Sequence, residues 1–108
     1  MSAAASHPLA SRLADEGLSA SEWSNGPGYT YAAHRHTYDK VLVARAGSIT
    51  FHLTELGRDV ELRGGERLQL PADTLHGATV GGQGVICLEA HAPQGFVGPA
   101  PVHLAEGW

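Results

Sequence analysis

Turn signals built on glycine occur at short intervals along most of the sequence, and they limit how long any regular element can be. They are Asn25-Gly26-Pro27-Gly28, Gly47-Ser48, Gly57-Arg58-Asp59, Gly64-Gly65 and Gly81-Gly82-Gln83-Gly84. Between them, apolar residues alternate with polar ones at Ile49, Phe51 and Leu53, at Val60 and Leu62, and at Leu68 and Leu70. Residues 40–44 form a nearly continuous apolar run, which is typical of a strand covered on both faces. The pattern predicts an all-β sandwich or barrel of short antiparallel strands.

The two ends of the chain depart from this pattern. Residues 8–16 are expected to form a short helix, because Pro8 suits its first turn and Gly17 suits its end. Leu9 and Leu13 would share one face of that helix. We therefore expect an N-terminal arm over residues 1–20 and a single barrel domain over residues 21–108. The segment from residue 93 to residue 108 carries three prolines and is expected to be irregular.

Composition argues against several classes of function. The formal net charge is −4, and the seven basic residues are scattered, so no basic patch for nucleic acid is predicted. No apolar run approaches the roughly 20 residues that span a bilayer, and the first residues do not read as a signal peptide. The single cysteine, Cys87, lies in an apolar strand and is expected to be a buried hydrophobe. These features lead us to expect a cytoplasmic protein.

Histidine is the unusual residue, with seven copies against a single lysine. His34 and His36 stand at positions i and i+2, so on a strand they would project from one face and could bind one metal ion together. His76 follows a turn-like segment and is a candidate third ligand. Periodicity alone does not bring His76 to the other two, and a pair of histidines on a solvated strand face is the simpler alternative.

Two motifs strengthen the metal interpretation by resemblance. Gly28-x5-His34-x-His36-x3-Lys40-x6-Gly47 resembles the first cupin motif, with lysine where that motif has glutamate. Gly65-x5-Pro71-x-Asp73-x2-His76-x3-Val80 resembles the second, with Asp73 in place of a glycine and Val80 in place of an asparagine. The resemblance covers residues 28–80.

This resemblance implies a small jelly-roll barrel with a metal inside it. It implies that His34, His36 and His76 are the ligands of one divalent transition metal ion: Fe, Mn, Ni, Zn or Cu. Three neutral imidazoles would leave coordination positions open for a small-molecule ligand or substrate.

Lys40 is the departure from the motif that matters most for function. Its strand parity with His36 points it toward the site, where an ammonium cannot ligate a metal and would be repelled by one. Lys40 could be neutral, could pair with Glu89 or Asp39, or could share the pocket with an anionic ligand. We therefore keep three interpretations open: a catalytic Lys40, a structural lysine–glutamate pair, and loss of the metal.

Further pocket candidates are Tyr38, Glu89 and His91, the last two sharing strand parity with Cys87. His52 should oppose the apolar face of its strand and be exposed. We expect a small metalloenzyme, either dioxygenase-like or a lyase or isomerase, that acts on a small organic molecule, anionic if Lys40 shares the pocket with it. The alternative is a non-catalytic ligand-binding module whose metal is structural or absent. With either function we expect a homodimer, built on an apolar outer strand containing Val41 and Val43.

Overall fold

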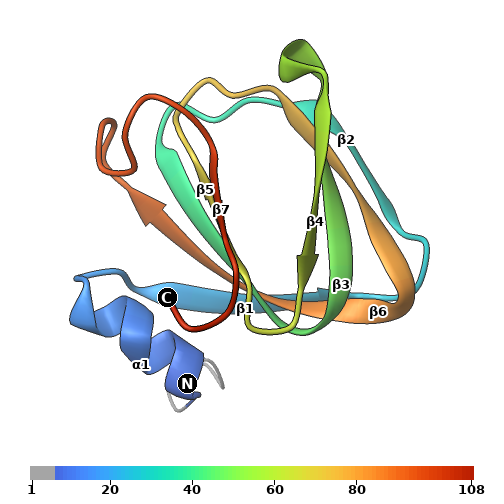
Figure 1. The fold of residues 1–108 in the computed structure, drawn as a ribbon, viewed down its shortest axis with the longest axis horizontal. Coiled ribbons are helices and arrows are strands. Elements are labelled where there is room, and N and C mark those ends of the chain that lie inside the picture. The colour runs from blue at the N-terminus through green and yellow to red at the C-terminus, as the bar shows by residue number, and fades with distance from the viewer. Residues whose placement is uncertain (1–6) are drawn as a thin grey trace.

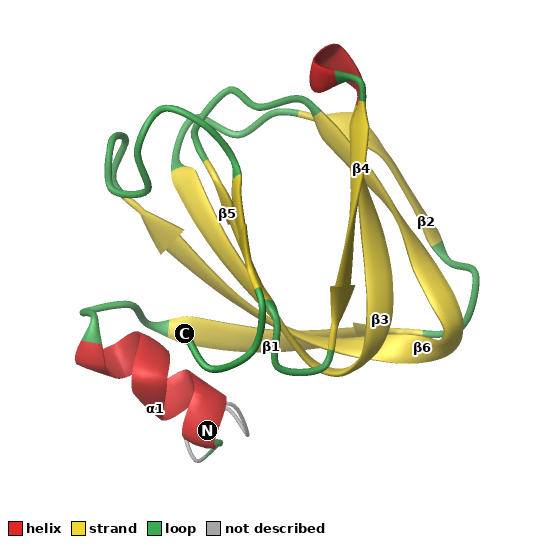
Figure 2. Ribbon diagram, in the orientation of Figure 1, coloured by secondary structure: helices red, strands yellow, loops and turns green. Residues whose placement is uncertain are grey.

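The computed structural model describes residues 7–108, and it contains a seven-stranded antiparallel sheet that curls into a barrel (Figure 1). The strands are β1 (Ala20–Asn25), β2 (Thr30–His34), β3 (Asp39–Leu53), β4 (Arg58–Arg63), β5 (Arg67–Leu70), β6 (His76–Ala92) and β7 (Val102–Leu104). One helix, α1 (Pro8–Asp15), lies outside the barrel beside β1, and a short 3-10 turn, η2 (Thr54–Leu56), precedes β4 (Figure 2). The predicted all-β architecture with a short N-terminal helix is confirmed.

Two long strands organise the sheet. β3 and β6 pair antiparallel along most of their length, and β1 and β2 extend the sheet from β6, while β4 and β5 extend it from β3. The prediction of turns at Gly47-Ser48 and at residues 81–84 was wrong, because these glycines bend β3 and β6 without ending them. Gly47 has a positive φ of 73°, and a Cβ there would collide with the carbonyl oxygen of Gly84. The glycines thus allow the two long strands to approach closely at a sharp bend.

The alternation of side chains along the strands divides the apolar residues into two clusters. Leu42, Phe51 and Leu62 belong to the cluster inside the barrel, whereas Val41 and Val43 belong to an outer one. The outer cluster also contains buried residues of α1 and of the segment after it, with Trp108 packed against it. Both valines have no exposed surface, so our proposal that they form a dimer surface was wrong: the chain's own helix and C-terminal segment cover them.

The C-terminal segment is more ordered than the sequence suggested. Within it, β7 pairs with β5, and the indole of Trp108 donates a hydrogen bond to the carbonyl oxygen of Gly65. The guanidinium of Arg67 lies 4.7 Å from the centre of the Trp108 ring and forms two hydrogen bonds, of 2.6 and 2.8 Å, with Glu16. These contacts tie the end of the helix and the C-terminus to the barrel.

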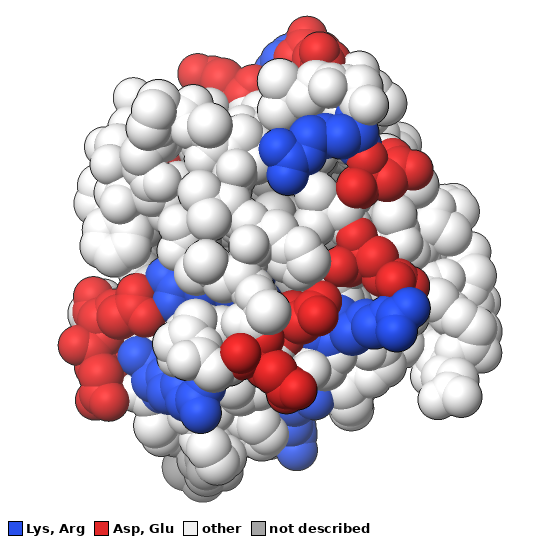
Figure 3. Space-filling model, viewed as in Figure 1, with Lys and Arg blue, Asp and Glu red and all other residues white. Residues whose placement is uncertain are grey.

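On the face shown in Figure 3, acidic and basic side chains lie next to one another. Among the described residues, no helix is long and apolar enough to cross a membrane.

Candidate metal centre

Three histidines from two neighbouring strands and a loop meet at one end of the barrel. His34 is the last residue of β2 and lies opposite His76, the first residue of β6. His36 lies in the loop that follows β2, so the prediction that both members of the His-x-His pair are on a strand was wrong. The carbonyl oxygen of His36 accepts a 2.7 Å hydrogen bond from the backbone of Asp73, which joins the loops before β3 and β6.

The backbone conformation of Asp73 allows this contact between the two loops. It is the one described residue other than glycine with a positive φ, 65°. Aspartate is among the few residue types that adopt this conformation at modest cost. Asp73 therefore supports the backbone turn that delivers His76 to the start of β6.

The imidazoles are close enough to share an ion. Their nearest potential ligand atoms all lie within 4.8 Å of one another, and the ring centres are 4.6 to 5.3 Å apart. The three residues differ in burial, since His34 is exposed, His36 half-buried and His76 only 4% exposed.

Each imidazole also has an oxygen next to its Nδ1 atom. The partners are the carbonyl of Ala32 at 2.7 Å from His34, the carbonyl of Thr74 at 2.8 Å from His76, and the Tyr38 hydroxyl at 3.1 Å from His36. A carbonyl can only accept, so Nδ1 of His34 and of His76 carries the proton and donates it. Nε2 of these rings then keeps its lone pair for a metal, as in metal sites whose ligands are oriented by an outer hydrogen bond.

The protonation state of the histidines also favours metal binding. Burial lowers the pKa of His76 to about 4, and the nearby charge of Lys40 acts in the same direction. Burial and then Lys40 likewise lower the pKa of His36. Neutral imidazole is the form that binds a metal, so the chemistry of the donor set fits one divalent transition metal ion.

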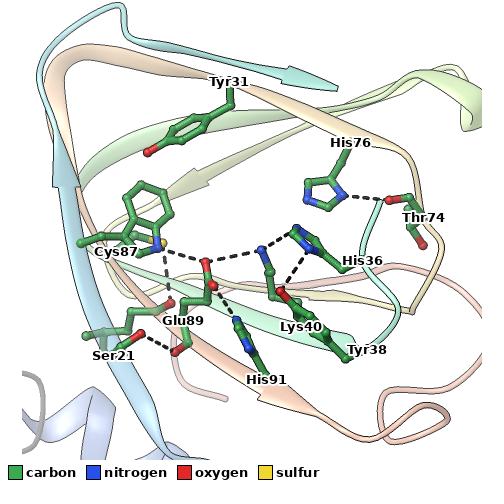
Figure 4. A network of polar contacts seen from close by, with 12 residues as sticks. Ser21, Tyr31, His36, Tyr38, Lys40, Thr74, His76, Cys87, Glu89 and His91 are labelled. Carbon is green, nitrogen blue, oxygen red and sulfur yellow. Dashed lines mark hydrogen bonds and ion pairs between the residues drawn. The ribbon is translucent and has the colours of Figure 1, made fainter. Parts of the chain in front are cut away.

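Lys40 lies beside this group, between His36 and Glu89 (Figure 4). Its Nζ atom is 3.0 Å from Nε2 of His36 and 3.5 Å from a carboxylate oxygen of Glu89. Lys40 is only 7% exposed. Its ammonium therefore donates to the same His36 nitrogen that would bind a metal.

Glu89 is held by three side chains. Its Oε1 accepts a 3.1 Å hydrogen bond from the indole of Trp23 as well as facing Lys40, and its Oε2 lies 2.7 Å from Nε2 of His91. Burial alone would raise the pKa of Glu89, but the His91 hydrogen bond and the charge of Lys40 outweigh it and lower the pKa. Glu89 is therefore the fixed anionic partner of Lys40.

A cavity of about 220 Å³ adjoins these polar groups. His34, His76, Lys40 and Glu89 line one part of it. The remaining lining residues are Trp23, Tyr31, Leu42, Ile49, Phe51, Gly77 and Ala78. The site thus combines a potential metal centre, a buried ion pair and a largely apolar wall.

Comparison with solved structures identifies the fold of the chain. A scan against protein-family models and a search of curated proteins found no match. Among solved structures, a cupin-2 domain protein from Shewanella frigidimarina has a TM-score of 0.59, with 14% identity over 71% of each chain. KdgF from a Halomonas species has a TM-score of 0.62, with 22% identity over 71% of this chain and 70% of that one. Oxalate decarboxylase from Bacillus subtilis, which has Mn(II) centres, has a TM-score of 0.58, with 19% identity over 73% of this chain and 22% of that one.

The chain has the cupin fold. The resemblance of its two motifs to those of cupins is accordingly matched by the architecture, and the three motif histidines come together at the end of the barrel. Lys40, at the motif's glutamate position, faces the cavity, as strand parity predicted.

The other pocket candidates have different positions in this cupin barrel. Glu89 lines the cavity, whereas His91 is half-exposed and stacks on Tyr38, with ring centres 4.2 Å apart. Neither His91 nor Tyr38 is among the residues that line the cavity; each instead contacts a residue of the site, Glu89 or His36. His52, expected to be exposed, is only partly so and contacts Asp59 and Thr79.

Sequence reasoning missed the residue that positions Glu89. Trp23 was not among the predicted site residues, yet its indole donates to Glu89 from β1. Trp23 could have been identified only from the pairing of β1 with β6. This pairing places Trp23 opposite Cys87, two residues from Glu89. No local sequence pattern encodes that pairing.

Proposed function

We propose that this cupin binds one divalent transition metal through His34, His36 and His76 and acts as a small metalloenzyme on a small organic molecule. The observation that carries the proposal is the orientation of the imidazoles, because outer oxygens hold His34 and His76 with Nε2 free, and all three rings converge. Imidazole suits Fe, Mn, Ni, Zn and Cu, so the donor set supports a metal without selecting one.

A bound metal would supply Lewis-acid polarisation of a substrate oxygen or, if redox-active, activation of dioxygen. The protein itself contributes the other functions of the site. Lys40 places a cation at the cavity wall, Glu89 anchors that cation, and the apolar wall excludes water from the part of the substrate that does not react. The similarity to oxalate decarboxylase, which has Mn(II) centres, is consistent with a lyase-type reaction.

A ligand-binding module without turnover is the second candidate, and one observation favours it. Lys40 replaces the glutamate of the first motif and contacts a nitrogen that a metal would need. A cupin that binds ligands through the Lys40–Glu89 pair alone would require no metal.

Turnover measurements on protein loaded separately with Fe(II), Mn(II) and Zn(II) distinguish the two candidates. A panel of small carboxylic acids, hydroxy acids and diketones would be followed by oxygen consumption and by NMR of the products. We expect turnover by at least one metal form, lost in His76→Ala and retained in His52→Ala, which removes a histidine outside the triad. Ligand binding with no turnover by any metal form would contradict the metalloenzyme and support the binding module.

A further inference from the structure

The hydrogen-bond capacity of Lys40 is only partly used. An ammonium has three donors, and Lys40 makes one side-chain hydrogen bond, to His36 at 3.0 Å, besides an ion pair with Glu89 at 3.5 Å. Lys40 lines the cavity, so its remaining capacity is directed at whatever occupies that space. A buried ammonium is costly unless it is fully hydrogen-bonded, and this favours a ligand that supplies an acceptor.

Metal binding would increase this demand. A metal at Nε2 of His36 would take the lone pair that now accepts from Lys40, and Lys40 would then lose its hydrogen bond to His36. Glu89 cannot make up the whole loss, because its two oxygens already face Trp23 and His91 as well as Lys40. The local positive charge would also rise, since a divalent ion would join an ammonium already present.

The rest of the cavity limits the size and polarity of the ligand. Its volume of about 220 Å³ is below the roughly 300 Å³ at which pockets for drug-sized molecules begin. Away from the polar groups, its wall includes Leu42, Ile49, Phe51 and Ala78, which offer apolar surface. A ligand with several charges would leave some of them unpaired against this wall.

We propose that Lys40 is the anion-recognising group of the cavity and that the substrate is a small monocarboxylate with a compact apolar body. The inference rests on the proposed metal site and specifies its substrate class. The carboxylate takes the hydrogen bond that Lys40 loses when His36 becomes a ligand, and the apolar body packs against the wall. Metal and carboxylate therefore bind cooperatively, each increasing the affinity of the site for the other by the same factor.

Binding measurements on zinc-loaded full-length protein test this inference without depending on activity. Isobutyrate serves as the carboxylate probe and isobutyramide as its neutral counterpart of nearly the same shape, both titrated by calorimetry. We expect isobutyrate to bind at least about tenfold more tightly than the amide. Lys40→Met should reduce that difference without abolishing it, because the zinc ion still attracts a carboxylate more than an amide. Arg63→Met, which deletes a positive charge on an exposed side chain outside the cavity, should preserve the difference in full.

A second measurement needs no variant at the site. The zinc affinity of the unaltered protein, determined by chelator competition, should be several-fold higher in saturating isobutyrate than in isobutyramide. Equal binding of the two probes, or a preference for isobutyrate that is as large in Lys40→Met as in the unaltered protein, would overturn the inference while leaving a zinc-binding protein intact. Failure of the unaltered protein to bind zinc at all would instead contradict the metal site itself, and the inference with it.

Discussion

Replacement of Lys40 by methionine should increase the affinity of the protein for a divalent metal. The substitution keeps the length and apolar stem of the side chain, so it preserves the packing of a residue that is only 7% exposed. It removes the ammonium that lies 3.0 Å from Nε2 of His36. The His36 nitrogen is thereby released, and a repulsive charge next to the metal is lost.

The magnitude follows from the distances. A metal about 2.0 Å from a histidine nitrogen would lie within about 5 Å of Nζ of Lys40. At that separation, the repulsion between a divalent ion and an ammonium is about 1.7 kcal/mol in bulk water and about 7 kcal/mol at an effective dielectric constant of 20. Because Lys40 can shift toward Glu89, we take the lower figure, which corresponds to roughly a twentyfold change in affinity.

Competition with a chromophoric chelator at neutral pH measures the zinc dissociation constants directly. Lys40→Met should bind zinc about twentyfold more tightly than the unaltered protein. The zinc affinity of Arg63→Met should be unchanged, because the Arg63 side chain is exposed and paired with Glu61. Equal or weaker binding by Lys40→Met would refute the argument that Lys40 competes with a metal for His36. The variant should at the same time show a smaller preference for carboxylates, and this opposite change distinguishes the effect from a general gain of stability.

Three further predictions concern stability, measured by urea unfolding. Gly47→Ala should lower the free energy of unfolding by more than about 2 kcal/mol, because of its positive φ and the collision with β6, whereas Gly82→Ala has open space and should cost far less. Glu16→Gln should cost about 2 kcal/mol, since it leaves the buried guanidinium of Arg67 without its anionic partner. Metal-free protein should lose about 2 kcal/mol between pH 7 and pH 5 through His76.

The sign of the pH effect follows from the two states of His76. Its pKa is about 4 in the folded protein, against 6.5 for the unperturbed group, so the unfolded chain binds the proton first as the pH falls. The stability contributed by the neutral, buried ring is complete above pH 6.5 and is lost as the pH falls toward 4. His76→Gln should flatten this part of the profile, and an equally steep profile in that variant would assign the effect to other groups.

A similar cost for Gly47→Ala and Gly82→Ala, or full stability of Glu16→Gln, would contradict the other two predictions.

The local elements of the fold could be predicted from the sequence because each leaves a local signal. Alternating apolar residues marked the strands around Phe51 and Leu62, and Pro8 and Gly17 bounded the helix. The prediction that Gly47 and Gly84 lie in turns that end strands was wrong for a physical reason. A glycine with positive φ is equally compatible with a turn that ends a strand and with a bend that continues it, and only the partner strand decides which one forms.

The same distinction applies to the site. His34, His36, His76 and Lys40 could be identified by their spacing, because the cupin motifs keep them within two short segments. Their surroundings could not, since Trp23 reaches Glu89 only through the pairing of β1 with β6. The cover over Val41 and Val43 likewise comes from both ends of the chain, which pack there through contacts of long sequence separation.

Metal content of the purified, untagged protein tests the central claim most directly. Elemental analysis after reconstitution should give about one divalent transition metal ion per chain, lost in His76→Ala and retained in His52→Ala. Absence of metal from the unaltered protein after reconstitution, or equal occupancy in both variants, would contradict a metal centre formed by His34, His36 and His76.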